Sequence, residues 1–216
     1  MKECSLVIEE KWLGRISYSD GLEIQNRCVE DRYKNKIEDT LLLLEHDSVY
    51  TIGRTRDKSS LKKNEPDLPY PVFETNRGGK ATYHGPGQLV GYPILNLRSY
   101  QKDLHIYLRS LEKSLINACK ECNIDATTRD GFTGVWCKNR KIASIGVGVR
   151  HWVSMHGFAI NVCGDLSPFN EIIPCGISGA EMTSIKNESG NELSVQDFSK
   201  IVSKSLKEEL LNLINQ

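Results

Sequence analysis

The sequence predicts one α/β (α+β) domain in which helices flank a mixed, largely antiparallel sheet. Two observations favour this fold class. Apolar segments of strand length outnumber the segments with helical periodicity, and strands and helices do not alternate regularly. A chain of 216 residues is long enough to bury a sizeable core, and no internal repeat or low-complexity segment interrupts it. Residues 1–216 are therefore expected to form a single domain.

The first half of the chain begins with a strand at 6–8 that ends near Gly14. Residues 17–37 carry apolar side chains at roughly helical spacing, and Ser19 or Asp20 is expected to cap this helix. Further strands are expected at 41–44 and 49–52, joined by turn residues at 46–48.

The clearest helix is expected at 104–122, where apolar side chains recur every three or four residues. Ser194 and Asp197 resemble a capping box that opens a last helix. The side chains expected on the core face of that helix are Val195, Phe198, Val202, Leu206, Leu210 and Leu213. Strands are expected at 72–74, 89–95, 134–137, 142–149 and 156–162, the third and fourth pairing across a turn at 138–141.

The composition disfavours several classes of partner. Lys+Arg and Asp+Glu balance at 28 each, so no net charge draws the chain to nucleic acid or an anionic membrane. No run approaches the ~20 apolar residues of a membrane span. Seven scattered cysteines without a disulfide framework, and the absence of a signal or transit pattern, favour the cytoplasm. An organellar matrix stays open if a transit peptide was removed. The basic segment 54–63 is either a solvated loop or a docking patch for an acidic partner.

A glycine-rich stretch at 77–88 lies between two expected strands. Glycine allows positive φ and close approach of a ligand to the backbone, and amides beside Arg77 and Lys80 suit a carbonyl, a phosphate or an oxyanion. The alternative is a structural loop in which His84 only satisfies a backbone group. The stretch is not a Walker A loop, because Ala81 follows the Gly-Lys pair.

Cys175 has the most unusual setting of the cysteines, since Pro174 precedes it and Gly176 follows. A thiol in such a loop is a candidate nucleophile, and the Gly176 amide could stabilise an oxyanion. An inert buried thiol is the alternative. A catalytic thiol needs an activating group, and both His84 and Lys141 are candidates. Lys141 could equally be a plain cation at the end of a hairpin turn.

Four blocks occur in a specific order along the chain. They are Arg77-Gly-Gly-Lys-Ala-Thr-Tyr-His-Gly-Pro-Gly-Gln88, Lys141-Ile-Ala-Ser-Ile-Gly146, His156-Gly-Phe-Ala-Ile-Asn161 and Ile173-Pro-Cys-Gly-Ile177. With these blocks the chain resembles the lipoyl(octanoyl) transferases, the lipoate-biosynthesis branch of the biotin/lipoate ligase superfamily, over about residues 42–182. Ile160 stands where that family usually has leucine, and the first forty residues match only loosely.

The resemblance implies a single catalytic acyltransferase domain over 1–216, with the superfamily's mixed sheet flanked by helices. It implies a two-step transfer in which Cys175 is acylated and Lys141 lowers the pKa of the thiol and passes protons. The residues that match the family's acyl site are Arg77, Gly78, Gly79, Lys80, Ala81, Thr82, Tyr83, His84, Ser144, Ile145, Gly146, Gly157, Phe158 and Ala159.

The resemblance also implies partners. Octanoyl-acyl carrier protein would be the donor, and the acceptors would be lipoyl domains of 2-oxoacid dehydrogenase E2 subunits and the glycine cleavage H protein. Neither ATP nor a metal is expected as a cofactor, and neither nucleic acid nor a membrane as a partner. The competing interpretations are an ATP-dependent lipoate or biotin ligase, a thioesterase that uses the same thiol, and a non-catalytic binding protein that kept the pocket.

Overall fold

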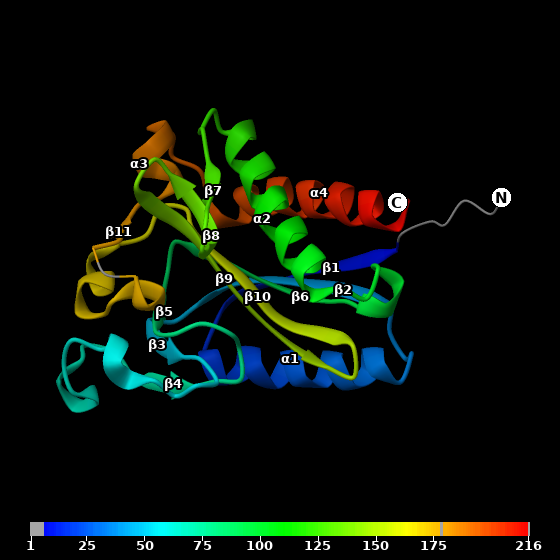
Figure 1. Ribbon diagram of the computed structural model, residues 1–216, viewed down its shortest axis with the longest axis horizontal. Coiled ribbons are helices and arrows are strands. Elements are labelled where there is room, and N and C mark those ends of the chain that lie inside the picture. The colour runs from blue at the N-terminus through cyan, green and yellow to red at the C-terminus, as the bar shows by residue number, and fades with distance from the viewer. Residues whose placement is uncertain (1–6, 178, 216) are drawn as a thin grey trace.

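A mixed sheet of eight strands forms the centre of the protein within residues 7–177 and 179–215, the part that the computed structural model describes (Figure 1). The strands are β1 (Ile8–Ile16), β2 (Asp39–His46), β6 (Gln88–Ile94), β7 (Thr127–Arg129), β8 (Phe132–Cys137), β9 (Arg140–Arg150), β10 (Val153–Asn161) and β11 (Glu181–Met182). Their order is β1-β2-β6-β10-β9-β8-β7, with β11 beside β9. The β1–β2 and β9–β11 pairs are parallel and the other pairs are antiparallel. The predicted mixed, largely antiparallel sheet is therefore confirmed.

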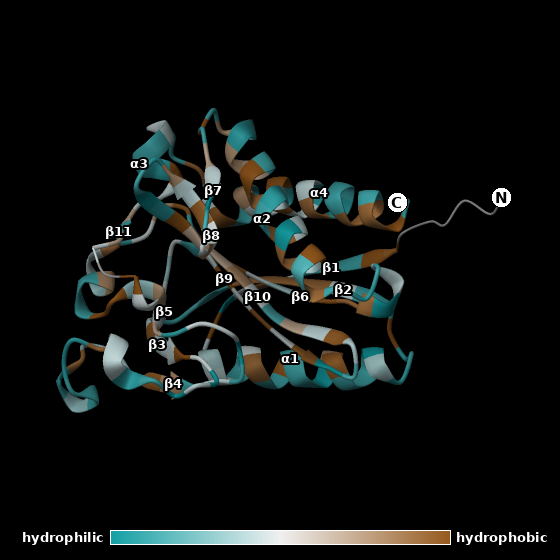
Figure 2. Ribbon diagram, viewed as in Figure 1, coloured by the Kyte–Doolittle hydropathy of each residue, from teal (hydrophilic) through white to brown (hydrophobic). Residues whose placement is uncertain are grey.

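Helices cover both faces of this sheet. The helix α1 (Tyr18–Tyr33) lies on one face, and α2 (Leu104–Glu121) and α4 (Val195–Ile214) lie side by side on the other (Figure 1). The short helix α3 (Ile185–Ser189) precedes α4. Hydrophobic residues recur between polar ones along α2 and α4 (Figure 2), as expected for helices with one buried side. None of the helices in the described part is long and apolar enough to cross a membrane.

The four consecutive leucines of β2 explain how both faces are filled. Leu41 and Leu43 belong to the core cluster under α2 and α4, whereas Leu42 and Leu44 belong to the cluster under α1. Successive side chains of a strand point to opposite faces, so a strand covered on both sides carries an unbroken apolar run.

The helix ends agree only partly with the predicted caps. Ser194 accepts from the Asp197 amide at 3.0 Å, as predicted for α4. For α1, however, Ser17 is the cap and neither Ser19 nor Asp20 is, because the helix already begins at Tyr18. The helix stops at Tyr33 rather than near residue 37, and the chain turns through a positive φ of 53° at Asn35.

The first strand and the core face of α4 differ slightly from the prediction. The first strand continues past Gly14 to Ile16, and its predicted start at Leu6, like Cys4, lies outside the described residues. On the predicted core face of α4, five of the six side chains are buried and Leu213 is half-buried.

A second, three-stranded sheet corrects one prediction. It has the order β4-β3-β5, with β3 (Val49–Ile52), β4 (Val72–Glu74) and β5 (Thr82–His84). The strands at 41–44 and 49–52 therefore separate into different sheets, although a short turn joins them. The glycine-rich stretch is not one loop, because Thr82–His84 pairs with β3 and divides the stretch in two. Tyr83 drives this pairing by packing into a small core with Tyr50 and Phe169.

Candidate active site

Cys175 lies on a short 3₁₀ turn, Pro174–Gly176, with left-handed backbone angles of φ 55° and ψ 17°. Its amide donates to the Ala81 carbonyl at 2.9 Å, which ties this turn to the glycine-rich segment. The Gly176 amide donates to Ile173 O at 2.9 Å. The expected use of that amide as an oxyanion donor is therefore wrong for this structure, because the local turn already occupies it.

Lys141 is the candidate activator that contacts the thiol. Its Nζ lies 3.2 Å from Cys175 Sγ and donates to Thr133 O at 3.1 Å. The side chain is fully buried, and its ammonium lies 5.4 Å from the centre of the Trp136 ring. Because the Lys141 side chain is enclosed in this way, its amine has few alternative positions and stays beside the sulfur.

The pKa of the Cys175 thiol results from opposing effects. Burial raises the pKa, but the Lys141 ammonium, the Ser144 hydroxyl and the Arg77 guanidinium together outweigh burial, so the pKa lies below its ordinary value. The Ser144 Oγ lies 3.6 Å from Cys175 Sγ. The thiolate, which is the nucleophilic form, is therefore favoured here.

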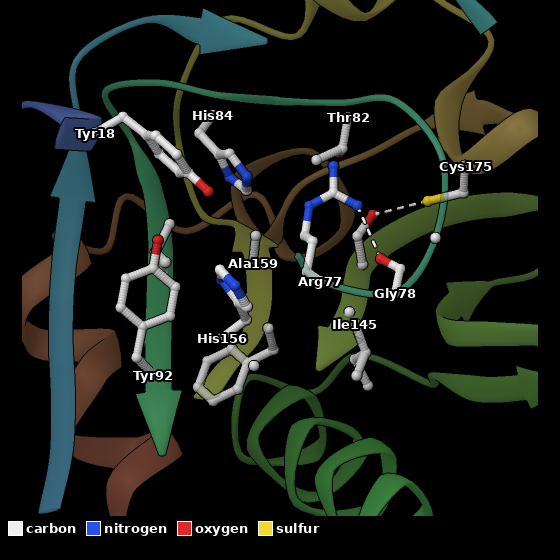
Figure 3. A pocket seen from close by; sticks show the side chains of 16 residues that line it. Tyr18, Arg77, Gly78, Thr82, His84, Tyr92, Ile145, His156, Ala159 and Cys175 are labelled. Atoms are coloured by element: carbon white, nitrogen blue, oxygen red, sulfur yellow. Dashed lines mark hydrogen bonds between the residues drawn. The ribbon is translucent and has the colours of Figure 1, made fainter. Parts of the chain in front are cut away.

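A pocket extends from Cys175 into the protein. In Figure 3, Cys175 lies at one end, Tyr18 and Tyr92 lie at the other, and Arg77 and His156 lie between them. Of the residues predicted from the sequence, those that line the pocket are Arg77, Gly78, Gly79, Thr82, His84, Ser144, Ile145, Gly146, Gly157, Phe158, Ala159 and Cys175.

Three of the residues predicted for the acyl site, and the predicted catalytic Lys141, lie outside the pocket lining. Alternation along β5 turns Thr82 and His84 toward the pocket and Tyr83 away from it, where its hydroxyl lies 3.0 Å from Ser48 Oγ. Lys80 is exposed and pairs with Asp57 at 2.9 Å. Ala81 is buried and acts through its carbonyl, which holds the Cys175 turn.

Four lining residues were not predicted. Tyr18 comes from α1, far from the blocks in the sequence, and Val90 and Tyr92 come from β6. No local sequence signal marks Tyr18. His156 opens one of the four quoted blocks and directly precedes the predicted Gly157, so its place in that block was the signal that could have found it.

His84 does not contact the thiol. Its Nδ1 lies 2.8 Å from Gln88 Oε1 and its Nε2 lies 3.3 Å from Thr51 Oγ1. Thr51 in turn accepts from Arg77 Nη2 through its hydroxyl at 2.7 Å and its carbonyl at 2.6 Å. Burial, with the nearby His46 and Arg77 charges, lowers the pKa of His84 to about 3. A neutral His84 therefore holds Arg77 and the glycine-rich segment in place.

Two buried polar atoms on the pocket wall have no hydrogen-bond partner within the described residues, Thr82 Oγ1 and His156 Nε2. The His156 amide donates to the Gln25 side-chain carbonyl, and the Gln25 Nε2 lies 3.5 Å from His156 Nδ1. Burial lowers the pKa of His156 to about 4, so the ring is neutral, and Gln25 leaves the proton on Nε2. Buried donors without partners are costly, which marks this wall as a place for ligand atoms.

Comparisons with known proteins identify the family of this chain. Residues 17–207 match the family described as the lipoyl protein ligase A/B catalytic domain. The chain belongs to this family. An octanoyltransferase of Geobacter sulfurreducens is 48% identical over 185 residues, which cover 86% of this chain and 77% of that protein. An octanoyltransferase of Citrifermentans bemidjiense is 49% identical over 203 residues, covering 94% and 97%.

A solved structure with a much less similar sequence has the same fold. An archaeal lipoate protein ligase from Thermoplasma acidophilum superposes with a TM-score of 0.69 at 14% identity, covering 94% of this chain and 84% of that one. This likeness supports the fold alone. The family match and the similar octanoyltransferases indicate that this protein is an acyltransferase, as the sequence predicted.

Proposed function

We propose that this enzyme transfers an octanoyl (or lipoyl) group from acyl carrier protein to a specific lysine of lipoyl-dependent enzyme domains, through a thioester on Cys175. This reaction would be the first step of endogenous lipoate biosynthesis. The observation that carries the proposal is the 3.2 Å contact between Lys141 Nζ and Cys175 Sγ at the mouth of a pocket. The names of the transferases at 45–49% identity support octanoyl as the acyl group.

In the first half-reaction the Cys175 thiolate attacks the thioester carbonyl carbon of the donor. The carbon–sulfur bond to the donor breaks, and the departing thiolate takes a proton from the Lys141 ammonium. The acyl chain enters the pocket, where Gly146 of β9 and Gly157 of β10 line the wall without a side chain. An added Cβ at Gly157 would lie 2.3 Å from the Gly91 carbonyl, so only glycine lets β10 and β6 approach this closely beside the pocket.

The acyl oxygen gains negative charge during this attack and needs a donor. The Gly176 amide is occupied, whereas the Thr82 hydroxyl lines the pocket with no partner among the described residues. We assign Thr82 Oγ1 as a donor to this oxygen, with the Arg77 charge nearby.

In the second half-reaction the amine of the acceptor lysine attacks the acyl carbon. Lys141, now neutral, takes the proton that the amine loses, and the carbon–sulfur bond to Cys175 breaks. The products are an octanoyl amide, the Cys175 thiolate and the Lys141 ammonium, which restores the starting state. The archaeal ligase of the same fold was studied with its E2 lipoyl domain, which supports lipoyl domains as acceptors here.

The donor thioester is already activated, so we propose that neither ATP nor a metal is required. The reduced thiol that this mechanism needs is stable in a reducing cytoplasm, the compartment expected from the sequence. An ATP-dependent ligase would have no use for the paired Cys175 and Lys141.

Intact mass spectrometry tests the proposal. Without ATP, octanoyl-acyl carrier protein should add one octanoyl group to the enzyme at Cys175, and an acceptor lipoyl domain should remove it. Cys175→Ser should prevent the labile thioester, while Cys163→Ser, which changes an exposed thiol, should not. Acceptor modification only from free octanoate and ATP would assign the protein to the ligases instead.

A further inference from the structure

A surface groove meets the acyl pocket at Cys175. The two share Gly78, Gly79, Ile145, Gly146 and Cys175. The groove continues outward between β9, the β7–β8 turn and the start of α2. A molecule held in this groove would reach the sulfur from the side opposite to the acyl chain.

The groove has exposed apolar walls. Leu104, Phe132 and Val149 are 38%, 37% and 39% exposed, and all three line it. They are half of the six large hydrophobic side chains that are exposed in the described part of the chain. Such a concentration beside a reactive thiol indicates a ligand surface.

One side of the groove is an open sheet edge. Beyond Ala143, β9 pairs with β10 alone. On the free side the Val147 carbonyl accepts from the Gly78 amide at 2.9 Å, and ladder alternation turns the amides of Val147 and Val149 to this same side. Neither amide has a hydrogen-bond partner within residues 7–177 and 179–215. Free amides in a groove can pair with the amides of an extended ligand.

Arg54 adds a cation to the groove. In the basic segment 54–63, carboxylates pair with Arg56, Lys58 and Lys63. Among the described residues none pairs with Arg54. If the segment serves as a docking patch, the cations that carry no ion pair in the described residues are therefore Arg54 and Lys62. Of these two, only Arg54 lines the groove.

We propose that this groove binds the phosphopantetheinyl arm of the acyl donor, an inference that rests on the proposed function. Such an arm offers two amides for the β9 edge, a dimethyl carbon for the apolar walls and a phosphate for Arg54. Its terminal sulfur carries the acyl group, so the arm in the groove and the acyl chain in the pocket would meet at Cys175. The side chain of an acceptor lysine has neither amide nor phosphate, which favours the donor as occupant.

Three substitutions test the groove without touching the catalytic residues. Phe132→Ala shortens an apolar wall, Arg54→Gln removes the cation, and Val149→Pro removes a free amide at an exposed position. Matched controls are Leu211→Ala, which is 40% exposed on α4, and Lys204→Gln, an exposed lysine away from the groove. Thermal unfolding of each variant shows that it folds.

The measurement is the rate of Cys175 acylation from three octanoyl thioesters, those of acyl carrier protein, coenzyme A and 2-mercaptoethanol. The first two share the arm, and the third lacks it. Each groove variant should lower kcat/KM about tenfold for both arm-bearing donors, by about 1.4 kcal/mol of lost binding. The mercaptoethanol thioester and the control variants should show no change.

Other outcomes overturn the inference. Equal losses with all three thioesters would mean that the substitutions disturb the thiol, and a loss with the carrier protein alone would indicate contacts to the protein rather than to its arm. A loss confined to transfer onto the acceptor domain would assign the groove to the acceptor. No loss at all would leave the arm elsewhere. If no thioester acylates the unmodified enzyme, the proposed function itself fails, and this result differs from all the others.

Discussion

Two buried cations, Lys141 and Arg77, lie near one thiol, and no carboxylate pairs with either of them in the described part of the chain. Burying an unpaired cation is costly, so the structure favours an anion between them. A thiolate at Cys175 would supply this anion, and the pKa of this thiol is lowered. The left-handed backbone at Cys175 is conformationally strained, and the surrounding contacts hold it in place. Such strain is common at functional sites.

Removing the lysine charge should shift the reactivity of Cys175 to higher pH. Because the ammonium lowers the thiol pKa, Lys141→Met raises it, and less thiolate is present at pH 7. The loss of the proposed general acid and base should reduce octanoyl transfer about 100-fold or more. The rate of iodoacetamide alkylation against pH reports the thiol pKa, and Lys138→Met, at an exposed turn lysine, is the control. An unchanged profile would contradict the assigned role.

Thr82→Val should separate catalysis from stability. The hydroxyl has no bond to lose in the free enzyme, so the free energy of unfolding should stay within about 1 kcal/mol. Loss of a donor to the developing oxyanion should slow acylation about 100-fold. Single-turnover acylation and urea unfolding measure the two effects, and normal acylation would remove Thr82 from the mechanism.

At the scale of elements, the site depends on an irregularity between β8 and β9. Their register shifts between Val135 and Trp136, and Gly134 has a φ of 129°. The Gly134 amide leaves the ladder and donates to Glu112 Oε1 on α2 at 3.0 Å. The strand therefore opens where the Lys141 side chain needs room, and α2 stabilises the opening.

Gly134→Ala should displace the lysine. An added Cβ would lie 2.5 Å from the Ala143 carbonyl and 2.8 Å from Lys141 Cε. We expect about 1–3 kcal/mol of destabilisation and an alkylation rate at pH 7 close to that of Lys141→Met. Gly131→Ala is the matched control, since Gly131 also has positive φ but open space around it, so only backbone strain of about 1 kcal/mol applies. Equal alkylation rates in the two variants would argue against this account.

At the scale of the whole molecule, three neutral histidines lie at or beside the pocket and come from both sheets. His46 Nε2 lies 2.7 Å from the Tyr92 hydroxyl, and His84 and His156 lie on β5 and β10. Burial lowers the pKa of His46 and of His156 to about 4 and that of His84 to about 3. All three are therefore neutral when folded, but they take up protons once the chain unfolds.

Stability should accordingly fall with acid. These folded-state pKa values lie below the unfolded value of 6.5, so the histidines' contribution is complete above pH 6.5 and is lost as pH falls toward 4 and 3. At pH 5 each histidine should lower the free energy of unfolding by about 2 kcal/mol. Urea unfolding from pH 7.5 to 5 measures the slope, which His46→Gln should reduce.

The sequence by itself determined the features that depend on neighbouring residues. Periodicity placed α2 and α4, Ser194 identified the start of α4, and the alternation of strand and turn residues placed most strands. The order of the blocks was enough for the family. These signals are local, because helix caps and side-chain spacing act within one or two turns of the chain.

Only the tertiary structure decided which distant residues meet. From the residues alone, both His84 and Lys141 were candidates to activate Cys175. Long-range packing places Lys141 against the thiol. It places His84 in contact with Thr51 and Gln88 instead. The same packing brought Tyr18 into the pocket and used the Gly176 amide in a turn. Sequence spacing carries no information on these contacts, since each depends on how separate strands and helices fill a shared core and satisfy their buried polar groups.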